Sequence, residues 1–139
     1  MQLAPAAIDV PILMPHRVMG RRVLVVDDNE DAADALAQLL RVSGHEVDVA
    51  YNGMCALARV RARRPDIVLC DLGLPELSGF DFARAIRHEH ADHIRLVAIS
   101  GYDRPEDIRR SLEAGFDAHL AKPAQSADIE SLFVRFSGS

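Results

Sequence analysis

The sequence has 139 residues, of which 49% are hydrophobic and 27% charged, values typical of one globular domain with a single core. Its formal net charge of −5 argues against a nucleic-acid-binding surface, which is normally basic. No run of about 18 or more apolar residues occurs, so a transmembrane helix is not predicted.

Residues 1–20 (MQLAPAAIDVPILMPHRVMG) precede the first regular pattern. Three prolines and an aspartate interrupt this stretch, and no basic residues stand before its apolar part, so it is a poor signal peptide. We therefore predict an N-terminal tail or linker over 1–20 and one folded domain over 21–139.

The first predicted strand is VLVV (23–26), a continuous apolar run that is typical of a strand buried on both faces. A helix is predicted over about 30–43, with either Asp28 or Asn29 as its cap and Gly44 just after its end. Its apolar stripe would be formed by Leu36, Leu39 and Leu40.

The same alternation continues to the end of the chain. Helix 52–64 contains an arginine run (RVRARR) that indicates a solvent-exposed face, and strand 66–72 contains Cys70, predicted to be a buried, reduced thiol. Five strands that alternate with five helices predict an α/β fold: a parallel sheet between two helical layers. The remaining strands are predicted over 45–50, 94–100 and 116–122, and the remaining helices over 78–90, 105–115 and 126–136.

Four predicted strands end in polar side chains. In an open α/β sheet, ligands bind beyond the carboxyl ends of the strands, and parallel strands bring these ends to one edge. The side chains expected to meet there are Asp27 and Asp28, Asp71, Ser100 and Lys122.

Three carboxylates in one crevice would repel each other unless a cation is bound. Carboxylate ligands without nearby His or Cys favour a hard divalent ion, Mg²⁺ before Zn²⁺. An ammonium group and a hydroxyl that face these acids suit a phosphoryl group, and an Asp can itself be the nucleophile that accepts it. Taken singly, each residue has a simpler interpretation as a helix cap, a turn residue or a solvated side chain.

Four motifs, VVDDN, DLGLPELSG, SGY and AKP, occur in this order at strand ends. Over about residues 21–136 the chain thereby resembles the response-regulator receiver domains of two-component signalling. The resemblance implies a flavodoxin-like strand order of 2-1-3-4-5. It also implies a phosphorylation-switched signal receiver that is a binding module and not an enzyme in the usual sense.

The resemblance assigns roles to individual residues. Asp71 would accept a phosphoryl group from a phosphohistidine on a histidine kinase or a histidine phosphotransfer domain. Mg²⁺ would be held by Asp28, Asp71 and the Gly73 carbonyl, with Asp27 reaching it through water, so that Asp28 matters more than Asp27. Lys122 and Ser100 would contact phosphoryl oxygens, Gly101 would leave room for them, and the peptide bond before Pro123 would be cis.

One position departs from the family pattern. The switch residue, three positions before Lys122, is usually Tyr or Phe, whereas here it is His119. His119 could still rotate or add pH sensitivity, but an ordinary surface position on the strand is the interpretation we favour. Another histidine group, HEHADH (88–93), fits no standard zinc spacing and is interpreted as an exposed helix end.

Two other functions remain open. An Asp-nucleophile phosphatase of the haloacid-dehalogenase kind would need Asp-x-Asp after the first strand, which Asp27-Asp28-Asn29 does not match. A receiver-like interaction domain without phosphorylation is disfavoured by the complete set of acids, Ser100 and Lys122.

Several expectations concern context. We expect no output domain in this chain, no contact with nucleic acid or membrane, and a cytoplasmic monomer or weak dimer. Phe133 and Phe136 are candidates for a docking face, although core packing of one of them is favoured. The chain could be a stand-alone regulator or the cytoplasmic receiver of a hybrid histidine kinase, towards which GLPELSG and SLEAGFDAHLAKP point.

Overall fold

A computed structural model describes residues 20–90, 93–101 and 104–137, and within these residues the predicted alternation of strands and helices is confirmed. Residues 1–19 lie outside this part of the chain, so the boundary of the N-terminal tail stays a prediction. The strands are β1 (Arg22–Val26), β2 (Glu46–Ala50), β3 (Ile67–Asp71), β4 (Arg95–Ser100) and β5 (Ala118–Ala121). The helices are α1 (Glu30–Val42), α2 (Gly53–Ala62), α3 (Gly79–His90), α4 (Pro105–Ala114) and α5 (Ser126–Ser137).

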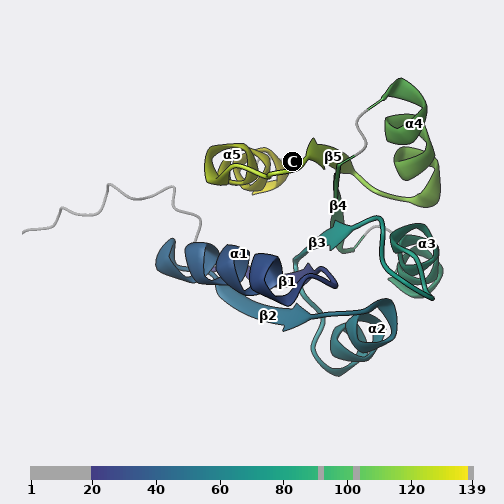
Figure 1. The fold of residues 1–139 in the computed structure, drawn as a ribbon. Coiled ribbons are helices and arrows are strands. Elements are labelled where there is room, and N and C mark those ends of the chain that lie inside the picture. Colours follow the sequence, from purple (N-terminus) through teal and green to yellow (C-terminus); the bar gives the residue numbers. More distant parts are fainter. Residues whose placement is uncertain (1–19, 91–92, 102–103, 138–139) are drawn as a thin grey trace, which may run out of the picture.

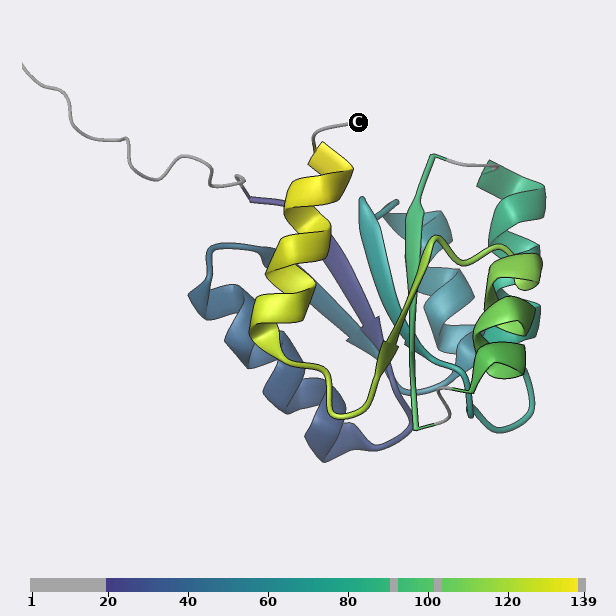
Figure 2. The same cartoon turned by 90° about the horizontal axis from the view of Figure 1, so that it is seen from above.

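All strand pairs are parallel, and the order β2-β1-β3-β4-β5 confirms the predicted topology. Helices α1 and α5 cover one face of the sheet, and α2, α3 and α4 cover the other (Figures 1 and 2). None of the described helices combines the length and the apolar character needed to cross a membrane.

Alternate residues of each strand belong to two separate cores. Val23 and Val25 of β1 pack under α1 and α5, whereas Leu24 and Val26 pack under the three helices of the opposite face. All four side chains are at most 2% exposed, which explains why the first strand reads as an uninterrupted apolar run.

The cap of α1 is Asn29 rather than Asp28. Its side-chain oxygen accepts a hydrogen bond from the backbone N–H of Ala32 at 3.0 Å. Because one side chain satisfies this end of the helix, neither Asp27 nor Asp28 is needed for capping.

The predicted apolar stripe of α1 is only partly correct. Leu40 is fully buried and Leu36 is half-buried, but Leu39 is 43% exposed. The spacing of the three leucines shows which face of α1 is apolar, but it does not show which neighbour covers each of them.

Candidate functional site

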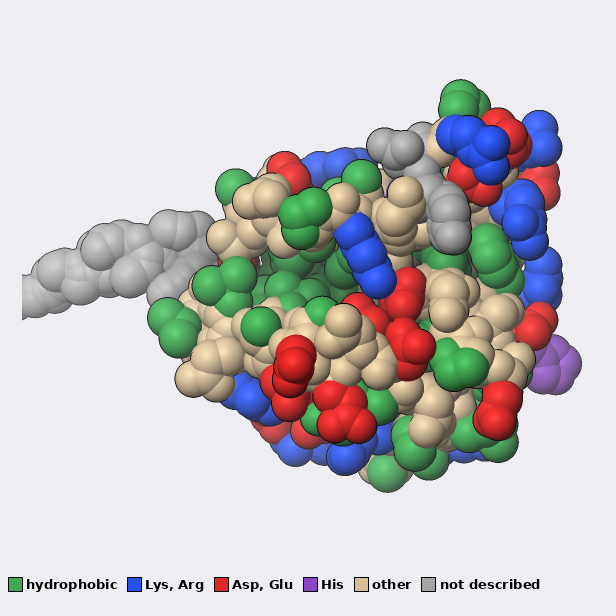
Figure 3. Space-filling view, viewed as in Figure 1, with side chains coloured by type: hydrophobic (Ala, Val, Ile, Leu, Met, Phe, Trp, Pro, Cys, Tyr) green, Lys and Arg blue, Asp and Glu red, His purple; other side chains and the backbone are tan. Residues whose placement is uncertain are grey.

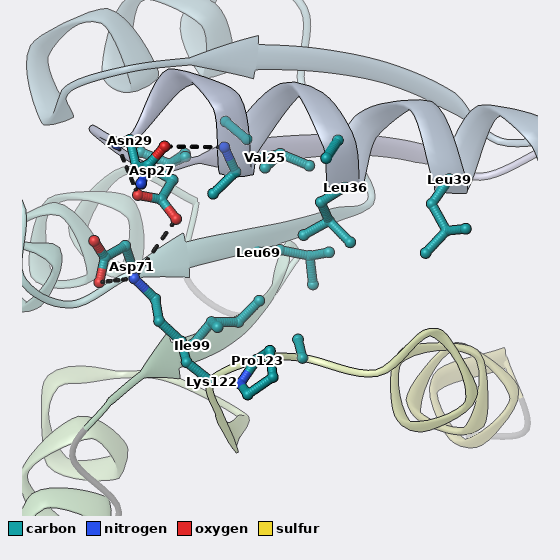
Figure 4. Close-up of a pocket in the computed structure, with 15 residues that line it drawn as sticks. Val25, Asp27, Asn29, Leu36, Leu39, Leu69, Asp71, Ile99, Lys122 and Pro123 are labelled. Carbon is teal, nitrogen blue, oxygen red and sulfur yellow. Dashed lines mark hydrogen bonds and ion pairs between the residues drawn. The ribbon is translucent and has the colours of Figure 1, made fainter.

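Lys122 and Asp71 approach each other at the carboxyl edge of the sheet. The Lys122 ammonium nitrogen lies 3.4 Å from Asp71 Oδ1 and 3.6 Å from Asp27 Oδ2 (Figure 4). Lys122 is the only lysine in the sequence, and it follows β5 directly. One cation therefore pairs with acids from two other strands.

Asp28 completes an acidic cluster with Asp27 and Asp71. One carboxylate oxygen of each residue lies within 4.8 Å of those of the other two. Asp71 is buried, Asp27 is half-buried and Asp28 is exposed, so the cluster opens to solvent on the side of Asp28. Three convergent carboxylates without a His or Cys among them are the donor set of a hard divalent cation.

Backbone N–H groups hold two of these carboxylates in place. Asn29 N–H donates to Asp27 Oδ1 at 3.0 Å, and Gly73 N–H donates to Asp71 Oδ1 at 3.1 Å. Within the described part of the chain, no hydrogen bond or ion pair reaches the second oxygen of Asp71, Oδ2. Asp71 is therefore oriented through one oxygen and keeps the other available.

The environment of Asp27 disfavours its ionised form. Burial is the largest cause that raises the pKa of this carboxyl above its ordinary value, and the neighbouring Asp71 and Asp28 raise it further. The N–H of Asn29 and the Lys122 cation act in the opposite direction without cancelling the effect. A further cation beside Asp27 would therefore favour the ionised form of this carboxyl.

Ser100 lies next to this cluster at the end of β4 and is only 2% exposed. Its carbonyl accepts a hydrogen bond from the Lys122 backbone N–H at 2.8 Å, which ties β5 to β4 at the site. The peptide bond between Lys122 and Pro123 is cis. A Cβ at Gly101, the residue after Ser100, would meet no described atom within 4 Å.

Gly79, the first residue of α3, lies against the site although no sequence motif identifies it as a site residue. A Cβ at this position would lie 2.6 Å from the Asp71 carbonyl oxygen and 2.8 Å from the Leu72 Cα. Only glycine lets α3 begin this close to the strand end that carries Asp71. The Ser78–Gly79 pair was a visible turn signal, but nothing in it indicated this approach.

His119 lies on β5, at the edge of the sheet. It is half-buried, and its Nδ1 lies 3.1 Å from Ser111 Oγ of α4. The Ser111 hydroxyl donates to the Ile108 carbonyl at 2.7 Å, so the His119 Nδ1–H is assigned as the donor to Ser111. This contact joins β5 to α4.

The other predicted groups lie away from the site. Among the described residues, the three aspartates form the only group of three or more potential metal ligands, so His88, His90 and His93 do not form one. Cys70 is buried and free, and burial raises the pKa of its thiol, which keeps it protonated and unreactive. Phe133 is fully buried and Phe136 packs at the edge of the same core.

An apolar groove of about 580 Å³ begins at the acidic cluster and runs along α1. Figure 3 shows it as a green hollow between α1 and α5, beside the red and blue side chains of the site. Its walls come from α1 and the β5–α5 loop, and its floor comes from the sheet (Figure 4).

The family model that matches this chain is the response regulator receiver domain, over residues 23–133. The chain is 38% identical over 120 residues to a gliding motility regulatory protein of Myxococcus xanthus, covering 86% of this chain and 15% of that protein. It is 35% identical over 111 residues to the DNA-binding response regulator MtrA of Mycobacterium tuberculosis, covering 80% of this chain and 48% of MtrA. The chain thus spans less than half the length of these relatives.

Solved structures show the same fold. The receiver domain of the sensor histidine kinase PA1611 from Pseudomonas aeruginosa, with a magnesium ion coordinated in its active-site cleft, matches with a TM-score of 0.78 and 30% identity, covering 86% of this chain and 99% of that one. A CheY-like receiver domain protein from Methanospirillum hungatei matches with a TM-score of 0.78 and 27% identity, covering 86% of this chain and 95% of that one.

Proposed function

Since the chain belongs to the response regulator receiver domain family, whose members are phosphorylation-switched signalling modules, we propose that it accepts a phosphoryl group from a phosphohistidine onto Asp71. The observation that carries this proposal is the position of Asp71, which faces Lys122 at 3.4 Å within a cluster of three carboxylates. No simpler role accounts for a buried acid, an acidic pair and the only lysine of the chain at one sheet edge.

The transfer uses the oxygen of Asp71 that the described contacts leave available. Asp71 Oδ2 attacks the phosphorus atom, the phosphorus–nitrogen bond of the phosphohistidine breaks, and an acyl phosphate forms on Asp71. The departing imidazole keeps the electron pair of the broken bond and takes up a proton. The bond from Gly73 N–H to Oδ1 holds the carboxylate for this attack.

Mg²⁺ is the cofactor that the acidic cluster fits, and it would neutralise negative charge on the phosphoryl oxygens when bound. We propose Asp28, Asp71 and the Gly73 carbonyl as its direct ligands, with Asp27 acting through water. The exposure of Asp28 and the pairing of Asp27 with Lys122 support this division. Substitution of Asp28 should therefore weaken Mg²⁺ binding more than substitution of Asp27.

Lys122 and Ser100 are proposed to contact the phosphoryl group. The Lys122 ammonium already faces Asp71, so it can pair with a phosphoryl oxygen placed there. The Ser100 side chain would donate to another oxygen, and the space that the described residues leave at Gly101 would admit the group.

His119 is proposed to take part in the switch through α4. Its bond to Ser111 means that a displacement of β5 near Lys122 would act directly on α4. In the family pattern a Tyr or Phe ring changes position at the switch. In this chain the switch would instead make or break the hydrogen bond between His119 and Ser111.

The proposed phosphodonor is a histidine kinase or a histidine phosphotransfer domain in the cytoplasm. The relatives of this chain are longer proteins, one of them a DNA-binding response regulator, and a solved neighbour is the receiver of a sensor kinase. We propose the receiver role for this chain, either alone or within a hybrid kinase, as a monomer or weak dimer without contact to nucleic acid or membrane.

Incubation with acetyl phosphate and Mg²⁺, followed by intact-protein mass spectrometry, tests the proposal. The wild type should gain one phosphoryl group, and Asp71→Asn should gain none. Asp81→Asn, an exposed acid on α3, is the matched control and should be modified like the wild type. The absence of an adduct on the wild type, or its persistence in Asp71→Asn, would reject the assignment.

A second assay separates this function from that of a phosphatase. A receiver should show no sustained turnover of p-nitrophenyl phosphate. Steady hydrolysis that survives Asp71→Asn would favour the phosphatase instead.

A further inference from the structure

A cavity of about 280 Å³ adjoins the candidate site beside α4 (the α4 pocket). Gly73 and Ser100, two residues of the site, line it, so the pocket lies next to the proposed position of the phosphoryl group. It is also lined by two arginines, Arg104 just before α4 and Arg110 within this helix. The other lining residues are Leu72, Phe80 and Asp107.

Arg110 brings to the α4 pocket a positive charge that no described acid neutralises. Its guanidinium carbon lies 4.5 Å from the centre of the Phe80 ring, a cation–π contact between α4 and its neighbour α3 (Figures 1 and 2). The ion pairs described at α4 involve Arg104 and Arg109, and none of them reaches Arg110. The ring thus holds the guanidinium at the pocket and leaves its charge available to an anion.

The net charge of the α4 pocket is positive. Its lining includes two arginines and one aspartate, which leaves one positive charge in excess. Arg104 is already paired, since its Nε lies 3.4 Å from Asp107 Oδ2 and 3.9 Å from Glu106 Oε2. The excess charge is therefore that of Arg110, and a ligand that enters this pocket should be anionic.

We propose that the α4 pocket receives the leaving group of the phosphodonor and that Arg110 makes the site favour donors whose leaving group is anionic. This inference rests on the proposed function, because it requires that Asp71 accepts the phosphoryl group. A donor whose phosphoryl group lies between Asp71 and Ser100 has the pocket directly beside it. A guanidinium can donate two parallel hydrogen bonds to a carboxylate, so a carboxylate is the leaving group that suits Arg110 best.

Two small donors differ in the charge of the group that leaves. When Asp71 Oδ2 attacks acetyl phosphate, the phosphorus–oxygen bond to the acetyl group breaks and acetate departs with the electron pair of that bond. Phosphoramidate carries a protonated nitrogen at neutral pH, so its phosphorus–nitrogen bond breaks and neutral ammonia departs with the electron pair. A cation in the pocket stabilises the negative charge that develops on acetate and repels the ammonium group of the second donor.

Initial rates of modification by each donor test the inference in the full chain, measured by intact-protein mass spectrometry at fixed Mg²⁺ and ionic strength. Arg110→Gln should lower the ratio of the acetyl phosphate rate to the phosphoramidate rate about fivefold, the effect of a partly exposed charge interaction. Arg110→Glu should lower this ratio further. Arg109→Gln, on the same helix but outside the pocket, is the matched control and should keep the wild-type ratio.

A wild-type ratio in both Arg110 variants would overturn the inference and leave the proposed function intact, because Asp71 would still be modified. An equal fall in Arg109→Gln would also overturn it, since the effect would then belong to surface charge in general. If neither donor modified the wild type, the proposed function itself would be rejected, and the leaving-group pocket with it. Each ratio is taken within one variant, so a loss of folded protein affects both donors alike.

NMR of the wild type provides a second measurement that needs no phosphoryl transfer. Phosphonoacetate joins a phosphonate to a carboxylate through carbon and cannot donate its phosphorus group. In the presence of Mg²⁺ it should shift the Nε–H signal of Arg110 and leave that of Arg109 in place, and methylphosphonate, which lacks the carboxylate, should shift neither. Equal shifts of the two arginines with phosphonoacetate would contradict the inference.

Discussion

The Lys122 ammonium nitrogen lies 3.4 Å from Asp71 Oδ1 and 3.6 Å from Asp27 Oδ2. The Lys122 side chain is 38% exposed, whereas those of Asp71 and Asp27 are 10% and 13% exposed. The cation thus approaches two largely buried acids from the solvent side. Its positive charge would oppose the binding of a divalent ion in the same cluster.

Replacement of Lys122 by Met should strengthen Mg²⁺ binding. The substitution removes a positive charge that competes with the ion, and a partly exposed pair of charges is worth about 1 kcal/mol, or about a fivefold change in Kd. Isothermal titration calorimetry at constant ionic strength measures the effect, with Arg135→Ala on the exposed side of α5 as the control. Unchanged or weaker binding in Lys122→Met would show that the cation does not oppose the metal.

Asp27→Asn should stabilise the metal-free protein at neutral pH. Because the pKa of Asp27 is raised in the folded state, the unfolded chain loses this proton first as pH rises above the ordinary value of 3.8. The wild type therefore loses stability between 3.8 and the folded-state pKa, and Asn, which stays neutral, avoids this loss.

Urea unfolding in EDTA at pH 7 and at pH 3 tests this prediction. The advantage of Asp27→Asn should be present at pH 7 and should disappear at pH 3, where the wild-type carboxyl is protonated in both states. Asp48→Asn on β2 controls for a change of net charge alone. An advantage of the same size at both pH values would contradict the assignment to ionisation.

Gly79→Ala should lower the free energy of unfolding by about 2 kcal/mol, the cost typical of overpacking, because its Cβ would collide with the backbone at Asp71 and Leu72. Gly101→Ala is the matched control, since its Cβ has open space among the described residues, and a change within about 0.5 kcal/mol is expected there. Chemical denaturation compares the two. If Gly79→Ala and the wild type had the same free energy of unfolding, α3 would be able to move away from Asp71 without loss of stability.

Arg87→Ala should cost about 3 kcal/mol of stability. The Arg87 guanidinium donates to the carbonyls of Gly115 and Ile94 and pairs with Asp117 at 2.8 Å, joining α3 to the loop between α4 and β5 and to the residue before β4. Lysine has no planar fork of donors, so Arg87→Lys should recover only part of the loss.

Arg84 on the same helix provides the control for Arg87. It pairs with Asp81 at the surface, where both side chains are more than half exposed, and Arg84→Ala should change stability by less than about 0.5 kcal/mol. If the two substitutions had equal effects in urea unfolding, the partly buried contacts of Arg87 would contribute no more to stability than the exposed pair of Arg84.

The order of strands and helices and the candidate site could be predicted from the sequence because both follow from local rules. Apolar runs such as VLVV identify buried strands, and a parallel sheet brings the residues after its strands to one edge. The sequence therefore predicts which side chains meet at the carboxyl edge of the sheet: Asp27, Asp28, Asp71, Ser100 and Lys122.

Only the tertiary structure decided how these residues and their neighbours meet. It made Asn29 the cap, paired Lys122 with both Asp27 and Asp71, turned His119 towards Ser111 and left Leu39 exposed. These features depend on the separation and orientation of segments that are distant in sequence. Hydrophobic periodicity reports which face of an element is apolar, but the packing of the whole chain decides which neighbour, if any, covers that face.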